Sequence, residues 1–301
     1  MSFWRALLVL GRVSNLPTVW SNCLCGWLLG LWAAGEGQVD WFVFGMLAVG
    51  ATGLYVGGMY LNDACDAWWD REHRPERPIP SGAIREQTVW LLGIGMMAGG
   101  MFLICLQGGT TALLALGLFN CILVYNFAHK QLSWSPLIIA ACRLLLILLA
   151  ACHAHTWATE GEAAFFKSSA GGVAIWAALV LFGYVAGLSW LAKVESTPGL
   201  VRVWPCLLLA LPAGLAFLTN DPADRRDALV MSTILLLWVL RSLRTTFWVE
   251  QRDVGHTVGG LLAGIVLVDL LAVAIVPAGL AVVFIALFVI ALSAQRWVPA
   301  T

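Results

Sequence analysis

Residues 62–82 read NDACDAWWDREHRPERPIPSG, a charged stretch in a chain that carries few charges elsewhere. Three aspartates, Asp63, Asp66 and Asp70, stand close together here, and an arginine-rich segment follows them. The 301 residues are 60% hydrophobic and 11% charged, whereas about 25% of residues are charged in soluble domains. Such a concentration of charge in an apolar chain indicates a place where an ionic ligand is handled.

Apolar runs of membrane-spanning length occupy most of the chain. A helix that crosses a bilayer needs about 20 mostly apolar residues. The runs predict nine transmembrane helices, at residues 13–34, 41–66, 86–107, 109–128, 134–155, 172–195, 200–218, 226–247 and 256–276. A further apolar run at 278–296 predicts either a tenth span or a re-entrant tail. We therefore expect an all-α, polytopic membrane helical bundle, with residues 1–301 forming a single domain.

The cationic residues are divided unequally between the two sides of this predicted bundle. Cationic side chains favour cytoplasmic loops. Twelve of the 17 Lys and Arg fall on one side: Arg5, Arg12, Arg71, Arg74, Arg77, Arg85, Lys130, Lys193, Arg202, Arg241, Arg244 and Arg252. Three fall on the other side: Lys167, Arg225 and Arg226. This asymmetry predicts that the charged stretch faces the cytoplasm. The net charge of zero gives no indication of nucleic-acid binding.

The spacing of the acidic residues is typical of a metal–phosphate site. If the second helix continues through the motif, Asn62, Asp66 and Asp70 share one face, with Asp63 beside them. Amide and carboxylate oxygens suit Mg²⁺, which is commonly held by one or two carboxylates together with substrate phosphates. Nearby arginines would then bind phosphate oxygens. The alternative is a solvated helix end with interfacial salt bridges.

The pattern N62-D63-x-x-D66-x-x-x-D70, followed by R77-P78-I79 and S81-G82, resembles the first signature of the UbiA superfamily of intramembrane prenyltransferases. This resemblance extends over the whole chain and implies about nine transmembrane helices around a central cavity. It implies prenyl transfer from a prenyl diphosphate to a hydrophobic acceptor of unknown identity, within the lipid bilayer. Asn62, Asp66 and Asp70 would bind Mg²⁺, Asp63, Asp66 and Asp70 would be catalytic, and Arg77 would bind diphosphate.

Two further positions match the family in order along the chain. Tyr125 and Lys130, in VYNFAHKQ, resemble a Y-x-x-x-x-K pattern that directs a lysine toward the diphosphate. The alternative is a cytoplasmic lysine beside an interfacial tyrosine. Arg143 lies well inside a predicted span, where a cation is costly and usually faces a bundle interior. We expect it to line the cavity with a carboxylate or diphosphate partner; the alternative is that it snorkels to the interface.

The second acidic signature of the family is missing. Where a pair of aspartates is expected, the chain reads YVAGLSWLAKVESTPGLVRVWP, with Tyr184, Lys193 and Glu195. Lys193 and Glu195 are the catalytic candidates here, and Tyr184 is a candidate for diphosphate binding. Positive charge near a leaving group can come from a lysine as well as from a metal. This variant, with R12-V-S-N15-L-P near the start and Y184-V-A-G-L-S-W-L-A-K-V-E195, looks like the EboC-like branch of the superfamily.

Other functions remain as alternatives. A non-catalytic lipid- or precursor-binding or transport protein on the same fold would explain the missing aspartates. A CDP-alcohol transferase is disfavoured because its glycine and arginine positions are not matched. An ion-coupled transporter is disfavoured because Asp269 is the main acidic residue inside a span, where it is expected to pack helices by hydrogen bonding. His153 and His155 are expected at the membrane interface.

Overall fold

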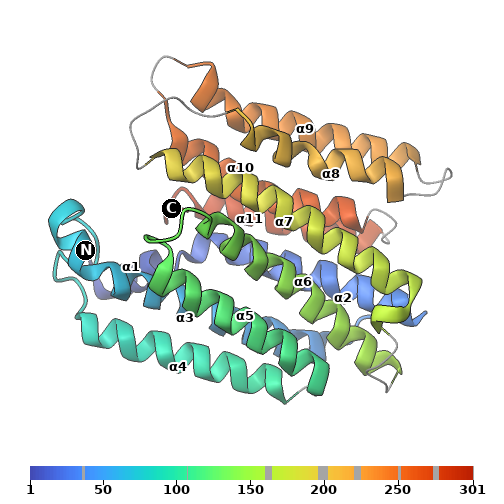
Figure 1. The fold of residues 1–301 in the computed structure, drawn as a ribbon, viewed down its shortest axis with the longest axis horizontal. Helices are drawn as coiled ribbons and strands as arrows, with labels where there is room; N and C mark the ends of the chain where they lie inside the picture. Colours follow the sequence, from blue (N-terminus) through green and yellow to red (C-terminus); the bar gives the residue numbers. More distant parts are fainter. Residues whose placement is uncertain are drawn as a thin grey trace.

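The computed structural model describes residues 1–35, 38–106, 108–159, 165–195, 203–219, 225–249, 252–273 and 278–300. These residues form eleven α-helices and two short 3-10 helices, without a β-strand among them (Figure 1). The helices are α1 (Phe3–Leu10), α2 (Leu16–Ala34), α3 (Trp41–His73), α4 (Glu86–Cys105), α5 (Gly109–Ala128), α6 (Ser135–Thr159), α7 (Ser169–Glu195), α8 (Pro205–Thr219), α9 (Arg225–Phe247), α10 (Val254–Ala272) and α11 (Ala278–Ala294). The 3-10 turns are η1 (Val13–Asn15) and η2 (Phe165–Lys167).

Seven helices in the described part of the chain are long and apolar enough to cross a membrane: α3, α4, α5, α6, α7, α9 and α10. Large apolar side chains such as Leu91, Leu113 and Leu207 are exposed on the outside of the bundle. A water-soluble protein would bury such surface, whereas lipid solvates it. The protein is therefore an integral, multi-pass membrane protein of the predicted all-α class.

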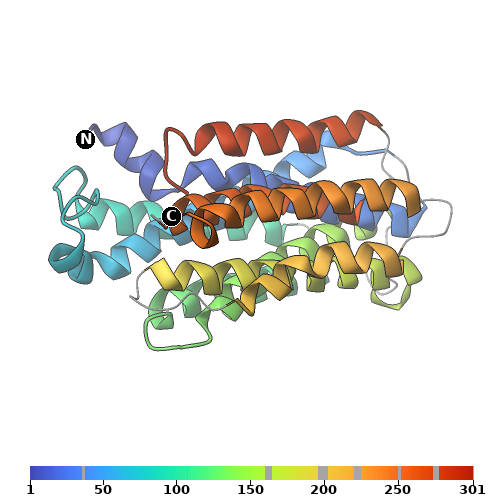
Figure 2. The same cartoon turned by 90° about the horizontal axis from the view of Figure 1, so that it is seen from above.

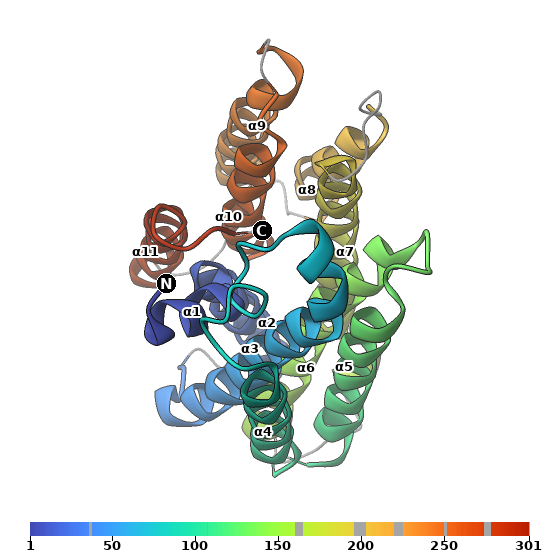
Figure 3. The same ribbon diagram turned by 90° about the vertical axis from the view of Figure 1, so that its left-hand side faces the viewer.

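The helices run side by side with alternating direction, so that connections gather at two ends of the bundle (Figures 1 and 2). One end carries both termini, the α3–α4 connection and the α5–α6 connection (Figure 1). In the end-on view the α3–α4 connection crosses the middle of this end (Figure 3). The charged stretch of residues 62–82 therefore covers the centre of the bundle.

Small residues allow α2 and α6 to pack at very short range. Gly26 and Gly30 lie one turn apart on α2, and a Cβ at either position would overlap the backbone of Ile147 or Ala151 on α6. Glycines at this spacing allow close helix approach in membranes, where packing rather than hydrophobic exclusion holds helices together. The contact fixes α6, and with it Arg143, against α2.

The predicted helices correspond to α2–α10, with boundaries that differ by a few residues. The apolar run at 278–296 forms a separate helix, α11, which packs on α2 and α10. The prediction did not include α1, because eight residues are too short for a spanning run. The expectation for His153 and His155 is wrong: both are 3% exposed and are buried against aromatic rings, those of Trp27 and Phe165.

Candidate active site

A cavity of about 800 Å³ opens between α2, α3, α5, α6, α7 and α10. Toward the middle of the bundle its wall is apolar, with side chains such as Val19, Leu54 and Leu146. At the end that carries the charged stretch, its lining includes Asp66 and Lys130. The size is typical of a pocket for a drug-sized or lipid-like ligand. The cavity therefore matches a ligand whose ionic head lies at the charged end and whose apolar tail lies along the apolar wall.

The helix α3 continues without interruption through the motif to His73. Asn62, Asp66 and Asp70 therefore fall on one face, and all three line the cavity. The predicted helical spacing is confirmed. Asp63 is buried and does not line the cavity. It lies seven residues before Asp70, about 20° from it around the helix, and the two carboxylates contact the same arginine, Arg77.

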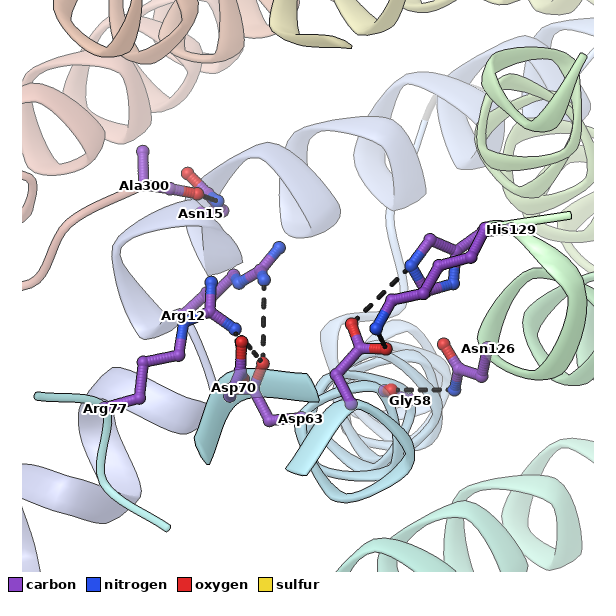
Figure 4. A network of polar contacts seen from close by, with 11 residues as sticks. Arg12, Asn15, Gly58, Asp63, Asp70, Arg77, Asn126, His129 and Ala300 are labelled. Carbon is purple, nitrogen blue, oxygen red and sulfur yellow. Dashed lines mark hydrogen bonds and ion pairs between the residues drawn. The ribbon is translucent and has the colours of Figure 1, made fainter. Parts of the chain in front are cut away.

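Arg77 joins two carboxylates of the motif. Its Nη1 donates to Asp63 Oδ1 and to Asp70 Oδ2, each at 3.1 Å (Figure 4). The loop after α3 returns Arg77 to the helix that it has just left, and Ser81 N donates to the Arg77 carbonyl. Arg77 also lines the cavity, within the predicted phosphate site. Its guanidinium at the same time neutralises the carboxylates of Asp63 and Asp70.

Arg12 reaches the same carboxylate from the connection between α1 and α2. Its Nη2 lies 3.8 Å from Asp63 Oδ1 (Figure 4), and the residue lines the cavity. Desolvation is the largest single effect and acts to lower the pKa of Arg12, but the combined attraction of Asp63, Tyr55, Tyr125 and Asp66 outweighs it, so the pKa is raised. Arg12 was not predicted as a site residue. The signal available in the sequence was the stretch R12-V-S-N15-L-P at the start of the first long apolar run.

Asp66 is held by the last residues of the α5 region. Lys130 Nζ lies 2.6 Å from Asp66 Oδ1, and His129 Nε2 lies 3.5 Å from Asp66 Oδ2. Tyr125 stacks on His129, with ring centroids 5.0 Å apart, and lines the cavity. Lys130 thus contacts the acidic motif directly, and Tyr125 stacks on His129, which also lies beside Asp66 and was not predicted as a site residue.

Trp69 also belongs to this cluster. The Lys130 ammonium lies 4.8 Å from the Trp69 ring centroid, within the range of a cation–π interaction. Trp69 lines the cavity, whereas its neighbour Trp68 is 62% exposed at the surface of the bundle. The aromatic ring therefore forms part of the wall beside the lysine.

The three residues predicted from the altered second signature separate in space. Lys193 lines the cavity, and its Nζ donates to the carbonyls of Leu132 and Ser133 at 3.3 and 3.0 Å. Tyr184 is fully buried outside the cavity lining, and its hydroxyl donates to the Leu261 carbonyl at 2.9 Å, which ties α7 to α10. Glu195 ends α7, and its side chain lies outside the described part of the structure.

Arg143 lines the cavity from α6, as expected, but its hydrogen-bond partners are neutral. Its Nη1 donates to Asn22 Oδ1 at 2.7 Å, and its Nη2 donates to Thr18 Oγ1 at 2.9 Å. The guanidinium also lies 5.8 Å from the Tyr55 ring centroid. Two polar residues of α2 and one aromatic ring of α3 therefore hold this cation inside the bundle.

Amide side chains tie the cavity wall together near the charged end. Asn126 Nδ2 donates to the Gly58 carbonyl at 2.9 Å, joining α5 to α3 (Figure 4). Asn15 Nδ2 donates to the Ala300 carbonyl at 2.9 Å, which holds the segment after α11 against the start of α2 (Figure 4). Asn15, Asn126 and Ala300 all line the cavity.

The sequence profile of the UbiA prenyltransferase family matches residues 23–191, more than half of the 301-residue chain. The chain belongs to the UbiA prenyltransferase family. This confirms the family predicted from the NDxxDxxxD motif. The EboC-like branch stays a prediction, because these comparisons do not distinguish branches of the superfamily.

Relatives and solved structures agree with this membership. The chain is 45% identical over 60 residues to a digeranylgeranylglyceryl phosphate synthase from Metallosphaera sedula, covering 20% of this chain and 21% of the relative. It is 30% identical over 126 residues to the enzyme of the same name from Ignicoccus hospitalis, covering 42% and 39%. These alignments thus span well under two thirds of each relative's own length.

Two solved structures share the UbiA fold with this chain. One, from a study of digeranylgeranylglyceryl phosphate synthase in membranes, superimposes with a TM-score of 0.55 at 15% identity, covering 97% of this chain and 100% of that one. The other is the apo structure of a UbiA homolog from Aeropyrum pernix K1, with a TM-score of 0.51 at 15% identity, covering 96% and 97%.

The donor atoms fit the Mg²⁺ that UbiA membership implies. Asn62 and Asp66 line the cavity and carry the hard oxygen atoms that suit Mg²⁺. Within the described residues, no three His, Cys, Asp or Glu side chains form a metal cluster by themselves. Mg²⁺ is commonly held by one or two carboxylates, completed by waters and substrate phosphates.

Proposed function

We propose that this protein transfers a prenyl group from a prenyl diphosphate to an apolar acceptor inside the membrane. The observation that carries the proposal is one cavity whose apolar wall ends in a cluster of carboxylates and cations. The prenyl tail of the donor lies along the apolar wall, and its diphosphate lies at the charged end. The names of the relatives suggest a geranylgeranyl donor and a glyceryl phosphate lipid acceptor.

The chemistry needs the negative diphosphate to approach Asp66 and Asp70. Mg²⁺, held by Asn62, Asp66 and Asp70 with Asp63 in support, supplies positive charge between carboxylates and phosphates when it is bound. Arg77 and Lys130 are paired with the carboxylates, so they are placed to transfer their hydrogen bonds to phosphate oxygens. Charge-assisted bonds of this kind are among the strong hydrogen bonds of proteins.

Carbon–oxygen cleavage gives the electron pair to the diphosphate and leaves an allylic cation on the prenyl group. Lys130, Arg77 and Lys193 stabilise the leaving group as its charge develops. Tyr125 and Arg143 form parts of the wall that orient the donor. A nucleophilic atom of the acceptor then bonds to the allylic carbon and loses its proton. The altered second signature is accommodated because Lys193 contributes a positive charge where a metal-binding aspartate pair is expected.

We further propose that the charged end of the bundle faces the cytoplasm. Both termini and the α3–α4 and α5–α6 connections lie at this end (Figure 1). Arg77 belongs to the first connection and Lys130 to the second, and Lys193 lies in the last turn of α7. The excess of cationic residues at one end is the pattern that sets the orientation of multi-pass proteins.

The alternative function is a lipid- or precursor-binding or transport protein on the same fold. The observation that favours it is that α7 supplies Lys193 to the cavity but no aspartate. A binding protein would hold a prenyl diphosphate with Mg²⁺ and release no diphosphate.

The deciding experiment is an assay of diphosphate release by the purified protein in detergent. The protein receives Mg²⁺, geranyl, farnesyl or geranylgeranyl diphosphate, and a panel of aromatic and lipid-alcohol acceptors. Asp66→Asn tests the motif. Asp40→Asn is the matched control, because Asp40 caps the opposite end of the same helix and Asn caps helices as well as Asp does.

Acceptor-dependent release that is lost in Asp66→Asn and kept in Asp40→Asn supports the transferase. Mg²⁺-dependent donor binding without release supports the binding protein. Release that is the same in Asp66→Asn and wild type contradicts the assignment of the motif.

A further inference from the structure

The buried carboxylate of Asp269 is joined to Arg143 through one side chain. Asn22 Nδ2 donates to Asp269 Oδ2 at 2.7 Å, and Asn22 Oδ1 accepts from Arg143 Nη1 at 2.7 Å. Both ends of the Asn22 amide are therefore used, and the amide dipole runs from the carboxylate to the guanidinium. Three helices, α10, α2 and α6, each contribute one member of this chain.

Two members of the chain, Asp269 and Asn22, are removed from water, while Arg143 lines the cavity. Asp269 is 1% exposed and Asn22 is fully buried. Ser21 Oγ donates to the same oxygen, Asp269 Oδ2, at 2.5 Å, so both hydrogen bonds draw the carboxylate toward α2. Hydrogen bonds in a low dielectric polarise one another, so an ionic group at one end strengthens the bond at the other end.

A charge inside a membrane requires a partner. Asp269 and Arg143 both lie within spanning helices, where ionisable groups are expensive and usually pair with one another. The described neighbours of Arg143 that accept its hydrogen bonds, Asn22 and Thr18, are neutral. Asp269 is the carboxylate that this hydrogen-bonded chain connects to Arg143.

We propose that Asp269 is a positioning residue: acting through Asn22, it fixes the Arg143 guanidinium at the cavity wall for contact with substrate. The inference rests on the proposed function of the cavity as a substrate site. Asp269 itself is absent from the wall of that cavity, so its effect on substrate must pass through Arg143.

The test uses three variants of the full chain. Asp269→Asn keeps the shape and removes the charge. Asp269→Glu keeps the charge. Ser21→Ala removes one hydrogen bond from the same carboxylate oxygen and keeps its charge, which makes it the matched control. Each is combined with Arg143→Gln, and KM, kcat and the Mg²⁺-dependent Kd of geranylgeranyl diphosphate are measured.

We expect Asp269→Asn to raise KM roughly tenfold for the substrate that contacts Arg143, and to change kcat by less than about threefold. Replacing a residue that orients a functional side chain typically has an effect of this size. Asp269→Glu should recover part of the loss, and Ser21→Ala should change KM less than about twofold. In the Arg143→Gln background, Asp269→Asn should have no further effect on KM. Two results would overturn the inference. One is a KM that is unchanged in Asp269→Asn, and the other is a double variant in which the effects of Asp269→Asn and Arg143→Gln on KM are additive in free energy.

Failure of the proposed function is recognised separately. If the wild-type protein releases no diphosphate, the Kd cycle with geranylgeranyl diphosphate still tests the inference. If it binds no donor either, thermal unfolding decides: replacing both Asp269 and Arg143 should be less destabilising than the two single changes added together. If the decrease in unfolding temperature of the double variant equals the sum of the decreases of the two single variants, Asp269 and Arg143 are not coupled. This result would overturn the inferred connection between them.

Discussion

Lys130 Nζ lies 2.6 Å from Asp66 Oδ1, and this contact joins the end of α5 to the acidic motif of α3. Asp66 lies on α3 and Lys130 lies in the turn after α5, and both line the cavity. Because the Lys130 ammonium also lies over Trp69, it is held on two sides at the charged end. This is the position from which a cation can turn to a departing diphosphate.

Replacing Lys130 with Met should therefore slow the chemical step. Loss of one donor aimed at developing negative charge typically lowers kcat about 10²-fold. Single-turnover release of diphosphate measures the effect. Lys130→Arg keeps the charge and should retain more activity than Lys130→Met. Equal rates for wild type and Lys130→Met would remove Lys130 from the leaving-group site.

Mg²⁺ removal should weaken donor binding. Without a bridging cation, the carboxylates of Asp66 and Asp70 repel the diphosphate. Calorimetric titration with geranylgeranyl diphosphate should show binding with Mg²⁺ and at least tenfold weaker binding after chelation, a difference of about 1.4 kcal/mol or more. Asp66→Asn should weaken the Mg²⁺-dependent part and Asp40→Asn should not. Tight binding in chelator by the wild type contradicts the metal assignment.

Arg77→Gln should destabilise the fold. The change leaves the buried carboxylates of Asp63 and Asp70 without the guanidinium that now lies 3.1 Å from each. Removing one partner of a buried charge pair costs about 3–5 kcal/mol. Unfolding in detergent measures the loss. Adding Asp63→Asn to Arg77→Gln should restore part of the stability, since fewer unpaired charges remain. A double variant less stable than Arg77→Gln alone would contradict this account.

Gly30→Ala should loosen the contact between α2 and α6. A Cβ at Gly30 overlaps the Ala151 carbonyl, and backbone cannot move aside as a side chain can. Overpacking of this kind costs about 1–3 kcal/mol. Gly45→Ala is the matched control, because no atom lies within 4 Å of a Cβ there. The control should be neutral or stabilising by about 0.5–1 kcal/mol through helix propensity. An unchanged unfolding temperature for Gly30→Ala would contradict the predicted overlap.

Much of the fold follows from the sequence because spanning helices are local structures. Lipid cannot satisfy backbone hydrogen bonds, so each long apolar run must form a helix by itself. For the same reason the register of Asn62, Asp66 and Asp70 on one face of α3 was predictable: it depends on helical periodicity alone. Local patterns did not predict α1, whose eight residues are shorter than a span.

Only the tertiary structure decided which groups meet. Arg12 reaches Asp63 from the connection before α2, Lys130 reaches Asp66 from the end of α5, and Tyr184 turns its hydroxyl to Leu261 rather than to the cavity. These contacts join residues far apart along the chain. They depend on how helices rotate and pack, which the pattern within one helix does not determine.

The sequence by itself therefore determined an all-helical membrane bundle with an acidic motif on one helix face, because backbone satisfaction and helical periodicity act within each segment. The tertiary structure decided the ionic partners of that motif and the connection of Asp269 to Arg143 through Asn22. The physical reason is that a buried charge takes its partner from whichever helix packing brings within hydrogen-bonding distance.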